Sequence, residues 1–218
     1  MKKYLIAFCS VAVMNIAVAQ SDISTFFQQL KTFQADFSQT VEQDGKTVQQ
    51  STGTVWLKKP LKFRWNYKTP EPMQLVSDGQ QFYHYDIGLA QVTTKPVSEV
   101  TGSALSTLLS DGQQLNDVFT IATLSVADVQ SKFPFKSMQW LDKATSFYQL
   151  TPKHKTIDDG QPNSLIIGLT ATQQLSLLFT EDNYGNNSFI FSNVKQGDGI
   201  ADSQFDFKAP KGVDVLGQ

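Results

Sequence analysis

The sequence predicts a mainly β (α+β) fold: an incomplete antiparallel β-barrel whose concave apolar face is covered by short helices. Beyond residue 33, most of the chain alternates apolar and polar residues in short segments that are separated by turn residues. Only two segments, near residues 22–30 and 101–111, show helical apolar spacing. A sheet of roughly ten strands curls, and its concave face must then be filled by side chains, helices or a ligand.

The N-terminal segment has the three parts of a secretory signal peptide. Residues 1–3 are basic at two positions, residues 4–18 are mostly apolar, and Ala17-Val18-Ala19 is a small-residue cleavage site. The apolar run is shorter than the roughly 20 residues that span a bilayer. We therefore expect residues 1–19 to be removed and residues 20–218 to form a single domain.

Cysteine and charge content narrow the compartment and the partners. The one cysteine, Cys9, lies inside the predicted leader, where the bulky Phe8 before it does not suit lipid attachment. The mature chain then has no thiol for disulfides, which suits a soluble monomer of the bacterial periplasm. With 18 basic and 20 acidic residues, the formal net charge is −2, which argues against nucleic acid as a partner.

The most informative stretch spans residues 53–67, two predicted strands joined at Pro60. Side chains of a strand alternate between faces, so residues of one parity share a face. That face carries Val55, Leu57, Phe63, Trp65 and a single cation, Lys59. It is either ordinary sheet core or the wall of an apolar cavity with one charge at its mouth.

Two helices are predicted against this sheet. The first begins at a cap, Ser21 or Asp22, and carries an apolar stripe: Ile23, Phe26, Phe27 and Leu30. Phe33 fits either the end of this helix or the start of the alternating strand that follows it. The second, Thr101–Asp111, places Leu105, Leu108 and Leu109 on one face. A helix this short is only marginally stable in isolation, so it must pack against the sheet. It is then either a movable cover or a permanently packed helix.

The expected hairpin turns are Asp44-Gly45 and Ser77-Asp78-Gly79. No catalytic chemistry accompanies them. His84 and His154 are far apart in sequence, and neither has the neighbours of a catalytic triad or a zinc site. No phosphate-binding loop or nucleophile elbow is present. We predict no enzymatic activity, no metal and no cofactor.

Several stretches, taken in order, carry a family likeness. They are Phe33-Gln-Ala-Asp-Phe-Ser-Gln-Thr40, the Trp-Leu-Lys-Lys-Pro and Phe-x-Trp within residues 53–65, Leu75-Val-Ser-Asp-Gly79, Leu150-Thr-Pro-Lys153 and Phe205-Asp-Phe-Lys-Ala-Pro-Lys-Gly-Val213. With them, the chain resembles the LolA-type outer-membrane lipoprotein carriers of the Gram-negative periplasm. The resemblance implies a chaperone that accepts outer-membrane lipoproteins from an inner-membrane ABC exporter, shields their acyl chains and passes them to an outer-membrane receptor.

The resemblance also suggests roles for single residues. Phe63 and Trp65 match the family's inner-face Phe-x-Trp and, with Val55, Leu57 and Leu75, form the expected acyl-chain cavity. Leu105, Leu108 and Leu109 are the lid candidates. The N-terminal helix with Phe26, Phe27 and Leu30 is either part of the lid or fixed core.

Lys59 stands where the family commonly has an arginine that hydrogen-bonds the backbone of the helical cover. Lysine can donate but lacks the guanidinium fork, so we hypothesise a weaker latch. The alternative is a solvated lysine at a strand edge.

Other interpretations stay open at this point. A lipid-anchored receptor of the same fold needs a cysteine after the cleavage site, which is missing. A periplasmic binding protein for another lipid or amphiphile would present the same apolar face, and a hydrolase lacks a visible catalytic set. The basic residues around Pro60 are either a docking rim or a solvated face: Lys58, Lys59, Lys62 and Arg64.

Overall fold

The computed structural model describes residues 19–100, 115–132, 143–153, 163–182, 185–197 and 199–217. The helices are α1 (Ala19–Gln29), α2 (Val97–Val100), α4 (Leu115–Val118), α5 (Val126–Lys132) and the 3-10 helix η3 (Asp202–Phe205). The first strands are β1 (Thr32–Gln43), β2 (Lys46–Lys58), β3 (Lys62–Thr69), β4 (Met73–Asp78), β5 (Gln81–Asp86) and β6 (Gln91–Pro96). They are followed by β7 (Phe119–Leu124), β8 (Ser146–Pro152), β9 (Ser164–Leu169), β10 (Leu175–Asp182), β11 (Gly185–Gln196) and β12 (Asp214–Leu216).

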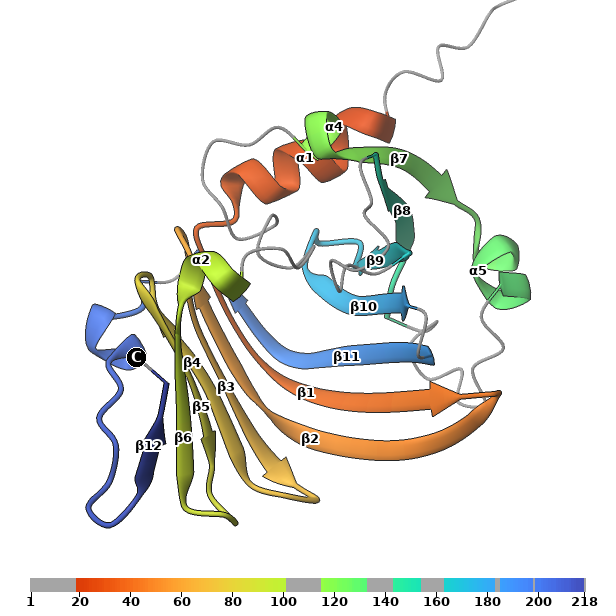
Figure 1. Cartoon of the computed structure of the whole chain (residues 1–218). Helices are drawn as coiled ribbons and strands as arrows, with labels where there is room; N and C mark the ends of the chain where they lie inside the picture. The colour runs from red at the N-terminus through yellow and green to blue at the C-terminus, as the bar shows by residue number, and fades with distance from the viewer. Residues whose placement is uncertain are drawn as a thin grey trace, which may run out of the picture.

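The twelve described strands form one curved sheet in the order β12-β6-β5-β4-β3-β2-β1-β11-β10-β9-β8-β7. Neighbours pair antiparallel except β12, which pairs parallel with β6. The sheet bends into an open trough, and β7 and β12 stay at its two edges (Figure 1). This confirms the predicted fold class, an incomplete and mainly antiparallel barrel with short helices.

Both predicted hairpin turns are present. Asp44 and Gly45 have φ of 50° and 70°, as a two-residue turn of the type that matches strand twist requires. In the second turn, the Asp78 carboxylate accepts hydrogen bonds from the backbone N–H groups of Gln80 and Gln81, each at 2.8 Å. These local interactions set the register of the strands on either side.

The β2–β3 hairpin keeps its alternation across Pro60, as the sequence predicts. Val55 pairs with Trp65, and Leu57 pairs with Phe63. Directly paired residues share a face. The Val55 and Trp65 side chains are 0% and 5% exposed and belong to the large core on the concave side of the sheet.

Helix α1 differs in its limits from the prediction. It begins at Ala19, before the expected caps, and ends at Gln29, so Phe33 is not on it. Phe33 lies instead on β1, where it pairs with Leu57 and is fully buried. Pairing with β2 places the Phe33 side chain in the core beside Leu57. The rest of the predicted stripe is buried against the concave face: Ile23, Phe26, Phe27 and Leu30.

A second, smaller core lies on the other face of β8–β11. Its centre is Phe147 of β8, Ile166 of β9 and Phe179 of β10, and Val129 of α5 packs into the same cluster. Strand β9 is buried at every residue because both of its faces are covered. This part of the sheet is the rigid end of the trough.

Gly53 is the tightest approach within the concave core. It pairs with Phe37, and a Cβ at this position would meet the Asn66 carbonyl and lie 2.6 Å from Phe37 Cζ. The Phe37 ring in turn has its centroid 5.0 Å from those of Trp65 and Tyr67. The missing side chain of Gly53 thus lets the aromatic cluster close over β2.

We expect Gly53→Ala to lower the free energy of unfolding by about 1–3 kcal/mol, because the added methyl overpacks this cluster. Urea unfolding followed by tryptophan fluorescence measures the change. Gly199→Ala is the matched control, since a Cβ at Gly199 meets nothing within 4 Å. Equal stability of the two variants would show that the Phe37 ring has room to move.

Candidate functional site

The candidate site is the aromatic wall of the concave face. Trp65 lies edge-on to Phe37 and Phe189, with ring centroids 5.0 and 5.2 Å away, and Phe189 stacks on Phe191. These rings come from β1, β3 and β11. In the sheet, β11 is next to β1, and β2 lies between β1 and β3. Edge-to-face aromatic pairs stabilise such a wall beyond the area that they bury.

The five residues predicted to line the cavity all face this side, but they differ in exposure. Val55, Leu57 and Trp65 are buried, whereas Phe63 and Leu75 are half-buried and pack against the edge of the same core. Leu75 pairs directly with Trp65 across β3 and β4. A ligand would therefore meet Phe63 and Leu75 first, and would reach Val55 and Trp65 only after the covering side chains move.

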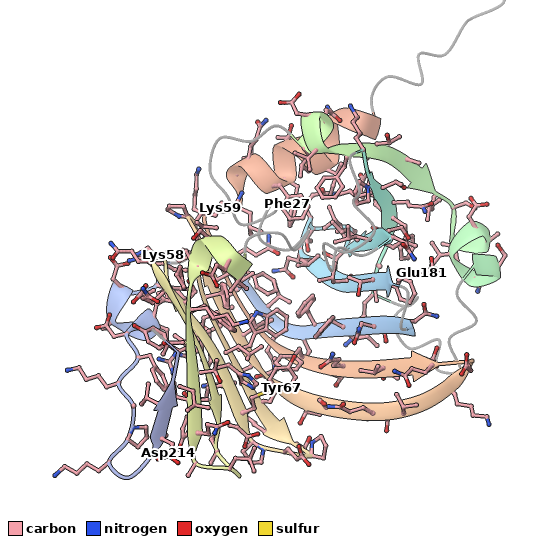
Figure 2. The ribbon with its side chains drawn as sticks, viewed as in Figure 1. Phe27, Lys58, Lys59, Tyr67, Glu181 and Asp214 are labelled. Carbon is pink, nitrogen blue, oxygen red and sulfur yellow. The ribbon has the colours of Figure 1, made fainter. Side chains whose placement is uncertain are left out.

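The cover described by the structure is α1, which lies across the open side of the trough (Figure 1). The Lys59 ammonium donates a hydrogen bond of 2.7 Å to the Phe27 carbonyl in the last turn of α1 (Figure 2). The Lys59 backbone N–H also donates to the Lys31 carbonyl at 2.9 Å. The Lys59 side chain thus fastens the β2–β3 turn to the last turn of α1, while its backbone binds the linker between α1 and β1. The other lid candidates, Leu105, Leu108 and Leu109, lie outside the described residues.

Tyr67 places one hydroxyl in this apolar wall. It is half-buried, its ring contacts Phe37, and it projects into the trough from β3 (Figure 2). Burial raises the pKa of the Tyr67 hydroxyl to about 12, because the phenolate would lose its water. The wall therefore favours neutral groups.

The other cations of the β2–β3 hairpin hold the C-terminal segment on the convex face. The Arg64 guanidinium donates to the carbonyls of Gln204 and Asp206, each at 2.7 Å. Lys58 and Lys62 form ion pairs with Asp202 at 2.7 and 3.2 Å. The hydrogen bonds and charges of Lys58 and Lys62 lower the pKa of Asp202. Desolvation by burial lowers the pKa of Arg64.

These three cations are not a freely solvated face, because a chain segment occupies their side of the sheet. The sequence held a signal for that segment. Phe205 and Phe207 alternate with polar residues; Phe205 is buried, and the Phe207 ring stacks on Tyr83 at 4.9 Å. The sequence alone did not show that this amphipathic segment packs on strands β3–β5.

Metal and membrane-spanning features are missing from the part of the chain that the structure describes. No group of three or more histidine, cysteine, aspartate or glutamate side chains is placed there to hold a metal ion. Within the same residues, no helix has the length and apolar character needed to cross a membrane.

The chain is similar to known proteins in sequence and in fold. The family described as "Outer membrane lipoprotein carrier protein LolA" matches residues 28–208. An outer-membrane lipoprotein carrier protein of Methylococcus capsulatus is 33% identical over 199 residues, which cover 90% of this chain and 86% of that protein. One of Albidiferax ferrireducens is 31% identical over 227 residues, 99% of this chain and 100% of that protein. Among solved structures, an uncharacterized conserved protein from Thermus thermophilus has a similar fold, with a TM-score of 0.53 at 10% identity over 90% of this chain and 98% of that one.

Tyr67 generates a prediction about alkaline stability. Its pKa is raised from 10.0 to about 12, so its contribution to stability is complete below pH 10 and is lost as the pH rises toward 12. A difference of this size corresponds to roughly 3 kcal/mol in full, of which about half is lost by pH 11. We expect Tyr67→Phe to lose less stability than the wild type between pH 8 and pH 11. Urea unfolding at the two pH values measures it, and parallel losses in both proteins would contradict it.

Proposed function

Because the chain belongs to the LolA family of outer-membrane lipoprotein carrier proteins, we propose that it takes up lipoproteins released from the inner membrane by an ABC exporter and delivers them to an outer-membrane receptor. Carriers of this family are periplasmic chaperones without enzymatic activity. The observation that supports this function best is the aromatic concave wall beneath a helix that one side-chain hydrogen bond fastens to the β2–β3 turn. The wall shields the acyl chains during transit.

Energetics favour a cover that competes with the cargo. Burying an acyl chain stabilises a complex by about 0.8 kcal/mol per CH₂, so several chains together would bind too tightly for ready release. In the closed protein, α1 buries its own apolar stripe on the same wall. Cargo must displace those contacts, and their return on release offsets part of the binding free energy.

Lys59 is the proposed latch of this cover. A lysine donates one hydrogen bond to Phe27 where an arginine would offer a fork, so the closed state is held less firmly. In this proposal, the latch sets the balance between an empty closed carrier and an open one that can take cargo.

The latch predicts opposite effects for two substitutions. Lys59→Met removes the bond to the Phe27 carbonyl, so it should increase the affinity for the apolar probe diphenylhexatriene by about 3–10-fold, as one net hydrogen bond allows. Lys59→Arg keeps the donor and should lower that affinity and change the rate of transfer to the receptor. Lys68→Met, at an exposed lysine on β3, is the matched control. If all three variants titrate like the wild type, Lys59 is a structural lysine and no latch.

Export precedes this activity in the proposal. We propose cleavage after Ala19, which removes the apolar leader and leaves the apolar stripe intact, since that stripe begins at Ile23. The mass of the protein recovered from a periplasmic extract gives the position of the cut.

A release assay tests the function as a whole. Spheroplasts that carry a labelled outer-membrane lipoprotein are incubated with the purified mature protein, and we expect the label to leave the membrane in a soluble one-to-one complex. Retention of the lipoprotein, while the protein still binds a fluorescent lipid, would move the function to another lipid or amphiphile. A heat-treated sample of the same protein controls for spontaneous shedding.

A further inference from the structure

Strand register aligns side chains on the concave face into rows that cross β2–β6. In the central row, Val55 pairs with Trp65, Trp65 with Leu75, Leu75 with His84, and His84 with Thr93. Residues paired directly in neighbouring strands project to the same side. The row therefore runs continuously from the aromatic wall to β6.

Polarity changes along this row at β5. Val55 and Trp65 are buried in the core, Leu75 is half-buried, and His84 and Thr93 are half-buried and polar. The outer end of the row is Leu216 on the edge strand β12, which is 49% exposed. Between β2 and β6, the apolar residues of this row therefore end at Leu75 on β4.

The two flanking rows also end in polar residues on β6, although one of them carries the apolar Phe82 on β5. One row passes from Leu57 and Phe63 through Ser77 and Phe82 to Lys95, and the other passes from Tyr67 through Met73 and Asp86 to Gln91. In all three rows the β6 residue is polar. We call His84, Gln91, Thr93 and Lys95 the polar margin of the wall. Asp86 is engaged in its own turn, where its carboxylate accepts from the Leu89 N–H at 2.9 Å.

His84 has a donor that a ligand can use. Its Nε2 lies 2.9 Å from the Met73 sulfur, and a thioether is a weak acceptor. A carbonyl oxygen in the trough would be a better partner for this N–H. Thr93 adds a hydroxyl at the paired position on β6.

We propose that His84, with Thr93 beside it, is a binding site for the ester and amide carbonyls where acyl chains join the glyceryl-cysteine end of a lipoprotein. This inference rests on the proposed function and says where the cargo's polar end lies. Acyl chains favour the wall formed by Trp65 and Leu75, but the carbonyls at their root lose water there and need donors. Beyond the indole N–H of the buried Trp65, the next donors along the central row are those of His84 and Thr93.

Phospholipids carry the same ester carbonyls. The proposed site therefore binds a group that phospholipids and lipoproteins share. The two differ in that only the lipoprotein has an amide-linked chain and a peptide. A comparison of both ligands with a hydrocarbon probe that has no carbonyl separates recognition of the polar end from burial of the chains.

The test uses the full mature chain and its variants His84→Leu and His84→Gln. Leucine extends the apolar row without a donor, and glutamine restores an N–H donor of similar reach. Each protein is titrated with a synthetic dipalmitoylglyceryl-cysteine peptide, with phosphatidylethanolamine and with diphenylhexatriene. Thermal unfolding of each variant shows whether the fold is retained.

We expect His84→Leu to weaken binding of the lipopeptide about fivefold and to leave diphenylhexatriene binding unchanged, with recovery in His84→Gln. A parallel loss for phosphatidylethanolamine would assign the contact to the shared esters, whereas a loss for the lipopeptide alone would assign it to the amide end. Equal weakening of all three ligands, or no change for the lipopeptide, would overturn the proposal. If the wild type binds the hydrocarbon but never the lipopeptide, the proposed function itself fails, whatever His84 does.

Discussion

An open curved sheet cannot fill its own concave side, and the rest of this structure depends on how that side is covered. The aromatic rings of β1, β3 and β11 pack against one another, but a further layer must cover them to exclude water. Helix α1 supplies this layer with its phenylalanine stripe. This contact is apolar and contains no directional bonds. Because the hydrophobic effect does not depend on direction, the hydrocarbon of a ligand can take the place of the α1 side chains.

The β2–β3 hairpin serves both faces of the sheet with different chemistry. On the concave side it presents Trp65 and Phe63 to the trough, and its turn reaches α1 through Lys59. On the convex side, Arg64 and Lys58 bind backbone carbonyls of the C-terminal segment. Several charge-assisted hydrogen bonds hold that segment, whereas the side-chain bond from this turn to α1 comes from a single ammonium group. The β2–β3 hairpin therefore holds the C-terminal segment by more charge-assisted bonds than it holds α1.

Local patterns were sufficient for much of the fold. The alternation of residues 53–67, the glycine turn at Asp44-Gly45 and the stripe of Ile23 to Leu30 each depend on neighbours in sequence, and the structure has all three. Phe33 has a spacing that fits both periods, so the local pattern left it open between the helix and the strand. Pairing with Leu57, which is far away in sequence, places it in β1.

The candidate site was predictable only in its apolar part. The parity of Val55, Leu57, Phe63 and Trp65 puts them on one face whatever the rest of the chain does, because strand geometry demands it. The partners of the cations were not predictable, since Phe27, Gln204 and Asp206 reach Lys59 and Arg64 through the packing of distant segments. The same holds for His84, which looks isolated in sequence but belongs to a row that crosses four other strands.

By itself, the sequence determined the fold class, the apolar face of the central hairpin and the likeness to lipoprotein carriers, because periodicity and short motifs are local properties of the chain. Tertiary structure alone decided which helix residues meet Lys59, that the convex cations bind the C-terminal segment, and where the wall turns polar. These are contacts between residues up to about 140 positions apart, as for Arg64 and Gln204. Such contacts depend on strand order and register across the whole sheet, which no local pattern contains.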